Sequence, residues 1–416
     1  MKIVFISNYI NHHQIPFCES LYSKLGDNFV FIQTQPMESE RKAMGWEVDI
    51  KKIPYVRCMY ESYDECMKLV LEADALIAGW MEDPTPAIKR MEQHKLTIRI
   101  SERIYREGQW KAVSLRGLKA KKYEHVRFKN DPAYLLCAGA YVPSDFNLIG
   151  AYPSKMYRFG YFPEFRSYDI EELLERKNKS EYIEIIYAGR FMPLKHPEYM
   201  IRLAEDILKE PNLPKCRIHM VGSGEMEDEL KQMVKDKGLE DAVRFYGFLL
   251  PGEVREVMEN SHIHVFPSNH LEGWGAVVNE AMNSGCAEVA SVEAGCVPTL
   301  ITQWENGVAY PKNDYVMMKE AVKKLAAEKE LREKIAKNAY RTIEKYWNSD
   351  YAACMLMNMI EGWLKGEDRA PKEGPLSPAP VISPRKMFSV MEKGNRKGKI
   401  NVSGQTDSNQ CNRPCV

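Results

Sequence analysis

The sequence predicts an α/β protein with two domains, each built around a parallel sheet. Its 416 residues are more than one compact core usually holds. Short runs rich in β-branched residues alternate with longer amphipathic stretches, which is typical of strands covered on both faces by helices. The same series begins again after a Gly-Tyr-Phe-Pro turn and a charged stretch within 160–182. We therefore expect one domain over 1–165 and a second over 183–346.

The first domain is predicted to contain five buried strands with helices between them. Its opening run of apolar residues is too short for the core of a signal peptide and indicates a first strand. Helix-length amphipathic segments occur at 14–25 and 85–94. The predicted strands of this half cover residues 2–8, 28–34, 73–80, 96–101 and 134–138.

The second domain repeats this architecture and is followed by two helices and a tail. Residues 331–365 have strong helical propensity but are broken at 347–349, where Asn or Ser can cap a new helix. Over 367–416 prolines accumulate with little apolar content, which predicts a disordered tail. The predicted strands of this half cover residues 183–188, 217–221, 243–246, 262–267 and 287–291.

Charge and cysteine content argue against several classes of protein. The 58 basic side chains balance 58 acidic ones, so no net charge indicates a nucleic-acid partner. The ten cysteines form neither a Cys-x-x-Cys pair nor a zinc-spaced cluster, which favours reduced cytosolic thiols. Because no run of about 18 apolar residues occurs, no segment is predicted to span a bilayer. We expect a cytoplasmic protein whose contact with the inner face of the cell membrane is at most peripheral.

The segment after the fourth strand of the second domain carries the strongest chemical signal. Over 271–282 it reads Leu-Glu-Gly-Trp-Gly-Ala-Val-Val-Asn-Glu-Ala-Met, a glycine-bearing loop that enters a helix. A helix N-terminus offers unpaired N–H groups and a positive dipole end, and glycines let a bulky anion approach the backbone. A diphosphate is therefore predicted to bind at the turn formed by Gly273, Trp274, Gly275 and Ala276.

Two carboxylates, Glu272 and Glu280, flank this turn. If the helix begins near Trp274, they lie on the order of 9–12 Å apart along the helix axis. Paired glycosidase carboxylates lie roughly 5–9 Å apart, so the wider spacing favours a grip on two ends of one long ligand. A nucleotide sugar is such a ligand, with hydroxyls of its ribose and of its transferred sugar as donors. The alternative for either glutamate is a helix-capping or surface role.

A cationic loop with Gly189, Arg190 and Lys195 follows the first strand of the second domain. Open α/β sheets bind their ligands at the carboxyl ends of strands. Negative charge builds on a nucleoside diphosphate as it leaves, and two cations in this loop would stabilise it without a metal ion. The sequence offers no Asp-x-Asp or other obvious Mg²⁺ cage. Two solvated loop cations are the alternative interpretation.

Two further glycine turns give weaker signals. Gly222 opens a Gly-Ser-Gly turn after a strand, which is a plain tight turn about as often as it is a ligand contact. Gly247 and Phe248 follow the next strand, where a base could lie against the backbone. A simple turn is equally compatible with this pair.

In combination these residues resemble glycosyltransferase family 4, a retaining family whose GT-B fold has two facing Rossmann-like domains. The resemblance covers about 1–365 and rests on the Gly-Arg loop with its Lys, the Gly-Ser-Gly-Glu turn and two glutamates separated by seven residues. It implies that Arg190 and Lys195 contact the donor diphosphate. It also implies that Glu280 holds the ribose and that Glu272 lies by the donor sugar.

The same resemblance implies a topology and a reaction course. The final helix, within 347–366, is expected to cross back onto the first domain. Transfer is expected at the front face with retention, because the departing phosphate helps to deprotonate the acceptor. No enzymic nucleophile and no cofactor are then needed.

The first domain departs from the family pattern at two loops. Many relatives have a Gly-Gly loop after the first strand, where this chain has His12 and His13. One of these histidines is either a donor contact or part of a helix cap. Many relatives also have a His after the fifth strand, where this chain has Glu102 and Arg103. These two residues either face the cleft or form a structural salt bridge.

Residues 110–129 interleave basic side chains with apolar and aromatic ones. A basic amphipathic stretch of this kind can lie on an anionic membrane surface, where it would meet a lipid-linked acceptor. A solvated helix face is the alternative interpretation.

We therefore expect a metal-independent, retaining transferase. It would move a sugar from a UDP-, GDP- or similar nucleotide to a saccharide or lipid-linked glycan, in cell-surface polysaccharide synthesis. Two other functions stay open, a nucleotide-sugar-binding regulatory protein without transfer and a sugar-nucleotide 2-epimerase on the same scaffold. The epimerase would release no free nucleoside diphosphate.

Overall fold

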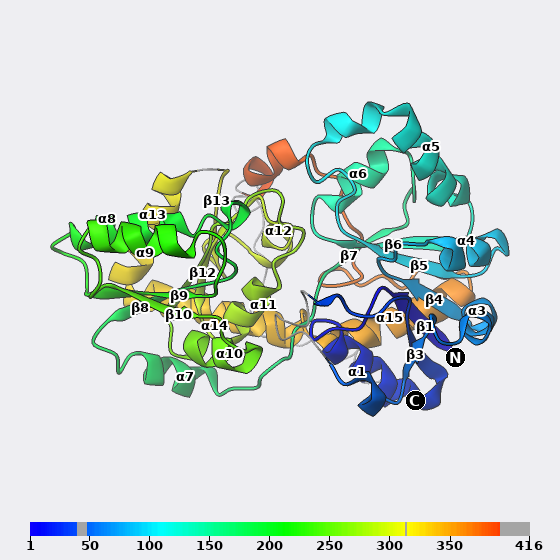
Figure 1. The fold of residues 1–416 in the computed structure, drawn as a ribbon, viewed down its shortest axis with the longest axis horizontal. Helices are drawn as coiled ribbons and strands as arrows, with labels where there is room; N and C mark the ends of the chain where they lie inside the picture. Colours follow the sequence, from blue (N-terminus) through cyan, green and yellow to red (C-terminus); the bar gives the residue numbers. More distant parts are fainter. Residues whose placement is uncertain (40–47, 313, 392–416) are drawn as a thin grey trace.

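The computed structural model describes residues 1–39, 48–312 and 314–391. Two parallel sheets stand side by side with helices packed around them (Figure 1). The first sheet has seven strands in the order β3-β2-β1-β4-β5-β6-β7. The second has six in the order β10-β9-β8-β11-β12-β13. The predicted α/β architecture of two Rossmann-like halves is confirmed.

All ten predicted strands are present, each with ends within two residues of the prediction. The structure adds three strands that the sequence pattern does not indicate, β3, β7 and β13. Each has only three or four residues and stands at a sheet edge, so it carries little of the apolar signal. The strands are β1 Ile3–Ser7, β2 Phe29–Gln33, β3 Val56–Cys58, β4 Ala75–Ala78, β5 Thr97–Ser101, β6 Ala133–Ala138, β7 Met156–Phe159, β8 Ile183–Ala188, β9 Cys216–Val221, β10 Val243–Gly247, β11 Ile263–Phe266, β12 Ala287–Ser291 and β13 Val308–Tyr310.

Helices connect successive strands, as the parallel order requires. In the described residues none of them is both long and apolar enough to cross a membrane. The helices are α1 Ile15–Leu25, α3 Tyr63–Glu72, α4 Thr85–Glu92, α5 Leu115–Glu124, α6 Val142–Leu148, α7 Ile170–Lys177, α8 Glu198–Leu208, α9 Glu227–Asp236, α10 Pro251–Glu259, α11 Ala276–Asn283, α12 Val297–Leu300, α13 Tyr315–Ala327, α14 Lys329–Lys345 and α15 Ser349–Leu364.

The last long helix, α15, returns to the first domain, as predicted. Asn348 separates it from α14, and its side chain accepts a hydrogen bond from the backbone N–H of Tyr351, which is the geometry of a helix N-cap. On the first domain the Trp363 ring stacks on Tyr134, with centroids 3.9 Å apart and planes inclined by 14°. Burial of this aromatic face against the sheet stabilises the crossing.

The segment after α15 is folded onto the first domain, so the prediction of a disordered tail over 367–416 is wrong for 367–391. The backbone N–H of Arg158 donates to Ser377 at 2.8 Å, and the N–H of Leu376 donates back to Arg158 at 2.8 Å. The Leu376 side chain is fully buried. This segment therefore pairs with the open edge of β7 and needs only one large apolar side chain to anchor it.

The chain then approaches the second domain. Met387 is buried beside Tyr141 of the first domain and Val292 of the second. In Figure 1 this orange-red end of the described chain lies between the two domains, near α12. The rest of the predicted tail, 392–416, lies outside the described residues.

Trp274 packs against both chain segments that connect the two domains, the linker after β7 and the segment before α15. Its ring is 1% exposed, and its Nε1–H donates to Asn279 at 3.0 Å. The ring lies 5.8 Å from Trp347, which precedes α15, and against Gly160, which opens the linker after β7. A Cβ at Gly160 would overlap the indole, so only glycine permits this approach. The two domains consequently share one apolar core.

We expect Gly160→Ala to destabilise the protein by about 1–3 kcal/mol, because the added methyl overpacks a buried ring that has no room to move. Thermal or urea unfolding would measure the loss. Gly252→Ala is the matched control, since its Cβ would meet only the end of a flexible arginine at 3.8 Å. Equal midpoints for Gly160→Ala and the unsubstituted protein would show that the indole does not pin this linker.

Candidate functional site

The cationic loop and the Gly-Trp-Gly turn meet in the second domain. Lys195 and Glu272 form a direct ion pair between their side chains, both of which are largely buried. The backbone supports this pairing, because the N–H of Asn269 donates to the carbonyl of Leu194 at 2.9 Å. The two loops follow β8 and β11, which are neighbours in the sheet. Two predicted site residues are thus brought together where the carboxyl ends of two strands converge.

Glycines allow the loops of this site to approach one another closely. Gly275 is the N-cap of α11 with φ of 100°, and a Cβ there would lie 2.7 Å from the ring of Phe266. Gly222 has φ of 131°, and a Cβ there would overlap the carbonyl of Gly189. The turns after β8 and β9 therefore pack backbone against backbone, as a ligand-binding edge with little side-chain cover requires.

Lys195 is held in a partly desolvated position. Its ammonium lies 5.4 Å from the centroid of the Phe266 ring as well as in contact with Glu272. An ammonium in this place attracts anions strongly, because partial burial weakens the screening by water. Arg190 differs from Lys195 in exposure and in charge pairing. The residue is exposed, and in the described part of the chain no carboxylate lies in ion-pair contact with its guanidinium.

Glu280 lies closer to the turn than the sequence predicts. Helix α11 begins at Ala276 rather than near Trp274, since Gly275 is still left-handed. Glu280 is therefore four residues into the helix, a rise of about 6 Å and only about one turn. The expected helix start near Trp274 is thus wrong by two residues, while the predicted separation of Glu272 and Glu280 stays a prediction.

The side chain of Glu280 is half-buried on α11. Burial raises its pKa, while the nearby positive groups Arg255, His264 and Arg166 act in the opposite direction. The balance leaves an acidic group that costs folding free energy when it is ionised. Such a cost is typical of a side chain retained for binding rather than for stability.

On the first domain, Glu102 faces the Gly-Trp-Gly turn. It follows β5, accepts a hydrogen bond from the Tyr161 hydroxyl at 2.8 Å and forms an ion pair with Arg106. A Cβ at Gly273 would overlap its carboxylate, so the carboxylate lies directly against the backbone of that turn. Arg103, by contrast, forms a nearly buried ion pair with Asp145 at 3.1 Å. Glu102 therefore lies against the Gly-Trp-Gly turn while it pairs with Arg106, and Arg103 forms a structural pair away from that turn.

His12 and His13 lie between β1 and α1, in the same domain as Glu102. Their rings are 3.9 Å apart, and that of His13 lies 6.3 Å from Tyr161. Burial lowers the pKa of His12, which favours its neutral form. The same tyrosine thus connects the first loop to Glu102. The sequence pattern indicates Tyr161 only as part of the boundary between the domains. Its hydroxyl contacts Glu102, and no local pattern predicts that contact.

The weaker candidates lie at the same sheet edge. The N–H of Gly222 donates to the carbonyl of Gly247 at 2.9 Å, and Gly247 has φ of 67°. Phe248 follows it with an exposed side chain. The structure places this turn beside the Gly-Ser-Gly turn but shows no contact from Phe248 to Lys195 or Glu272.

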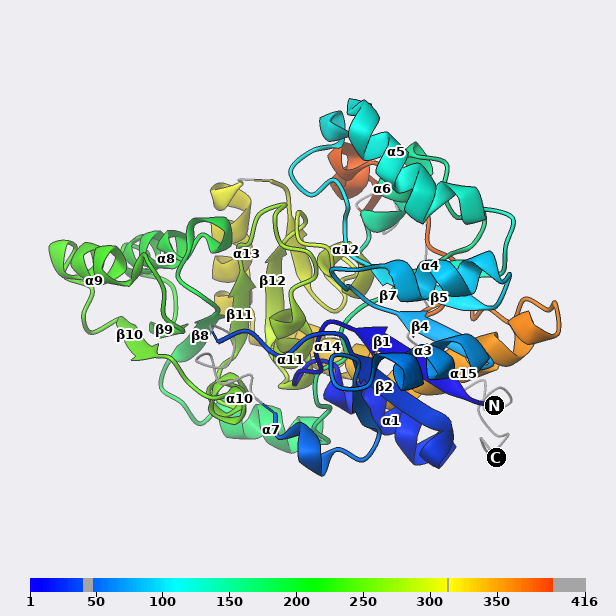
Figure 2. The same cartoon turned by 45° about the vertical axis from the view of Figure 1, so that its right-hand side comes forward.

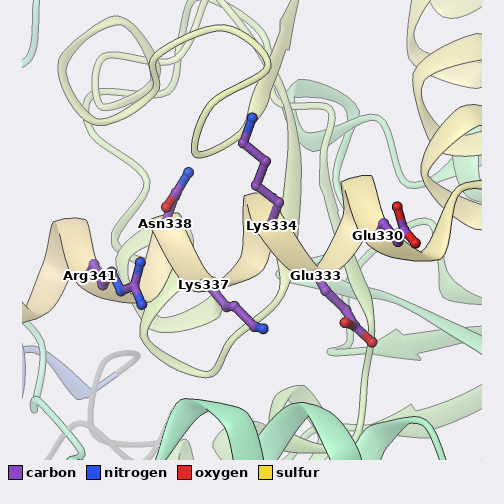
Figure 3. Close-up of a pocket in the computed structure, with 6 residues that line it drawn as sticks. All are labelled: Glu330, Glu333, Lys334, Lys337, Asn338 and Arg341. Atoms are coloured by element: carbon purple, nitrogen blue, oxygen red, sulfur yellow. The ribbon is translucent and has the colours of Figure 1, made fainter. Parts of the chain in front are cut away.

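A shallow hollow of about 310 Å³ on α14 lies apart from these residues (Figure 3). Its walls are charged side chains of the helix surface, several of which already have partners. Lys337 pairs with Glu171 at 2.5 Å, and Glu333 accepts from Asn178 at 2.7 Å. None of the predicted site residues lines it.

In the part of the chain that the structure describes, no group of three or more His, Cys, Asp or Glu could hold a metal ion.

Comparison with known proteins gives a family match for the second domain. Residues 169–342, which include α7 and the second sheet, match the family described as glycosyl transferases group 1. The chain is 28% identical to an α-D-kanosaminyltransferase of Streptomyces kanamyceticus over 44% of its own length and 48% of the relative's. It is 31% identical to an uncharacterized glycosyltransferase of Methanocaldococcus jannaschii over 42% and 44%. The match thus spans less than half of either relative.

The fold as a whole resembles that of Anabaena HepE, solved in complex with UDP. The TM-score is 0.64 at 14% identity, over 87% of this chain and all of the HepE chain. Both sheets and the returning helix therefore belong to the GT-B arrangement. Residues 169–342 thus match the glycosyl transferases group 1 family, and the chain as a whole has a GT-B fold.

Proposed function

We propose that this protein is a retaining glycosyltransferase of family 4. It transfers a sugar from a nucleoside-diphosphate sugar, such as a UDP- or GDP-sugar, to a saccharide or lipid-linked glycan in cell-surface polysaccharide synthesis. The observation that carries the proposal is the Lys195–Glu272 pair beside the N-terminus of α11. Support comes from the HepE structure, which contains UDP.

The ion pair suggests how a donor is taken up. A diphosphate that enters the turn replaces Glu272 as the partner of Lys195, and the N–H groups that open α11 contribute further hydrogen bonds. Glu272 is then released to accept hydrogen bonds from hydroxyls of the transferred sugar. Arg190, exposed on the same loop, adds a second cation. In this proposal positive charge on the protein, rather than a metal ion, stabilises the leaving group.

The reaction itself needs no nucleophile from the protein. The bond between the anomeric carbon and the diphosphate oxygen breaks, and the acceptor oxygen forms the new bond on the same face. The acceptor proton passes to the departing phosphate. Lys195 acts most strongly as that phosphate gains charge.

The first domain supplies the acceptor side. Glu102 and Tyr161 form a hydrogen-bonded pair against the turn, and His13 stands beside the tyrosine. These groups can accept or donate hydrogen bonds to sugar hydroxyls but lie on the other domain from Lys195. In the proposal they orient the acceptor, while the second domain binds the donor.

Lys195→Ala is expected to reduce transfer by roughly ten- to a thousandfold, since a lost ionic contact in a preorganised site costs about 1.5–4 kcal/mol. The donor base is first identified by thermal shift, in which a nucleoside diphosphate at 100 times its Kd adds about 2.7 kcal/mol. Lys209→Ala, an exposed surface pair with Glu205, is the control. Release of nucleoside diphosphate at an unchanged rate would remove Lys195 from the mechanism.

Glu280→Gln is expected to weaken donor binding by roughly tenfold or more, as the ribose loses a charged acceptor. The same variant should unfold at a higher temperature than the unsubstituted protein near pH 7. Burial raises the pKa of Glu280, so the ionised carboxylate opposes folding above its unfolded pKa and the protonated form does not. The stability difference should therefore shrink as the pH falls towards 4.

Two melting series over pH, one with donor nucleotide and one without, would test this expectation. Glu256→Gln, an exposed position of α10, provides the control. Loss of stability at neutral pH together with unchanged nucleotide binding would assign Glu280 a structural role.

Peripheral membrane contact is part of the proposal. Trp110, Val113 and Leu115 are 70%, 80% and 85% exposed, and Lys111 and Arg116 lie among them. Helix α5, which begins in this patch, lies at the outer end of the first domain in Figure 2. Apolar side chains of this size are seldom left in water next to each other without a partner. Exposed cations around them suit an anionic surface.

We expect the protein to float with anionic liposomes at low salt and to be released by high salt. The double variant Trp110→Ser, Leu115→Ser should reduce the floated fraction, because it removes the apolar contacts while keeping the charges. Leu208→Ser, an exposed apolar position of the second domain, is the control. A floated fraction that is unaffected by the double variant would contradict the patch, and absence of flotation would contradict membrane contact.

A further inference from the structure

A cavity of about 430 Å³ lies where the two domains and the C-terminal segment meet. The first domain contributes the turn after β6 and the strand β7, and the second contributes α12 with the residues that follow it. Residues 379–391 close the third side. None of the predicted site residues lines this cavity. Its lining includes Gly139, Arg158, Ile382, Met387 and Val390.

The position of Arg158 on β7 is fixed by backbone pairing on its outer edge. Its N–H and carbonyl both bond to the C-terminal segment at 2.8 Å. The preceding residue, Tyr157, packs on the opposite face against Trp363, with ring centroids 5.4 Å apart. Since successive side chains of a strand point to opposite faces, the guanidinium of Arg158 is directed away from α15 and into the cavity.

Arg158 is half-buried without a compensating group. The described residues provide no hydrogen bond and no ion pair to its side chain, and burial lowers its pKa. The more deeply buried arginines of this protein are treated differently. Arg90 donates to several carbonyls, Arg255 to Asn283 and Arg332 to two carbonyls. A half-buried guanidinium that no protein group pairs with is available to bind an anion.

The rest of the cavity is mainly apolar. Ile382, Met387 and Val390 of the C-terminal segment supply one wall. Its volume lies in the range of pockets that hold small organic molecules. A lone inorganic anion would satisfy the arginine but leave these side chains without contacts. The lining therefore fits a molecule that has both an anionic head and an apolar chain.

We propose that this cavity binds an anionic amphiphile. The anionic head accepts hydrogen bonds from the Arg158 guanidinium, and the apolar chain runs along Ile382, Met387 and Val390. The site is separate from the Lys195–Glu272 pair, although the two are neighbours. Gly139 lines the cavity, and a Cβ there would lie 3.0 Å from the carbonyl of Gly273 in the donor turn.

Occupancy should stabilise the arrangement of the two domains. The walls belong to both domains, which also meet directly here through the bond from the Ala140 N–H to the carbonyl of Gly295 at 2.9 Å. A ligand that touches both walls binds the folded, assembled form alone. It therefore raises the melting temperature, and the rise grows with the logarithm of the ligand concentration once that exceeds the Kd.

Octyl phosphate, kept below its critical micelle concentration, tests the proposal with the full-length chain. Calorimetry should show saturable binding, and the melting temperature should rise. Inorganic phosphate and 1-octanol are the matched partial ligands, and each should bind at least roughly tenfold more weakly. Octanoate shows whether the head must be a phosphate or merely an anion. Equal binding of 1-octanol would overturn the role of Arg158.

Arg158→Gln should weaken octyl phosphate roughly tenfold or more. Arg116→Gln, in the exposed basic stretch at α5, should bind as the unsubstituted protein does. The opposite result would place the amphiphile on the α5 surface and overturn the proposal. Should Arg158→Gln fold poorly, Val390→Trp fills the cavity from its exposed wall and should also abolish binding. Retained binding in that variant would likewise overturn it.

The test is independent of the proposed transferase activity. UDP should not displace octyl phosphate, and Lys195→Ala should bind it normally. Displacement by UDP would mean that the amphiphile occupies the nucleotide turn, which contradicts a separate site. Failure of UDP to bind at all would count against the proposed function and leave the cavity result intact.

Discussion

The burial of Trp274 is the contact on which the rest of this structure depends. The indole fills the space beside Gly160, approaches Trp347 and donates a hydrogen bond to Asn279 of the helix that follows it, α11. It is therefore fixed against both chain connections between the domains. Because Trp274 stands in the middle of the turn, the same contact sets the position of its flanking glycines. The backbone of Gly273 consequently meets Glu102 of the other domain.

The sequence predicted the fold well wherever a local pattern reports burial. Strands covered on both faces, such as β8 and β12, are largely apolar apart from one Glu each and match the prediction to the residue. Edge strands such as β7 are short and gain their stability from a neighbour that is distant in the chain. The error at 367–391 has the same origin. Its backbone is satisfied by β7, a partner that no local composition can reveal.

The residues of the candidate site likewise divide into those that the local sequence identifies and those that only the fold brings together. Residue type and spacing identified Lys195 and Glu272, and the structure brings their side chains into contact. The error for Glu280 arose at one backbone position, since a left-handed Gly275 delays the helix. Tyr161 was missed because its importance lies in reaching Glu102 across the sheet edge. Roles that depend on two distant segments thus required the three-dimensional arrangement.

The pairing of residues 376–377 with β7 has a consequence for the behaviour of the chain in solution. A sheet whose last strand ended at β7 would present unpaired backbone groups, which invite association with a second molecule. The short C-terminal segment occupies those groups and presents Pro378 at the bridge to Tyr157. Since proline has no N–H to offer, the sheet cannot easily be extended further on that side. Residues beyond α15 that look dispensable in the sequence therefore protect the protein from aggregation.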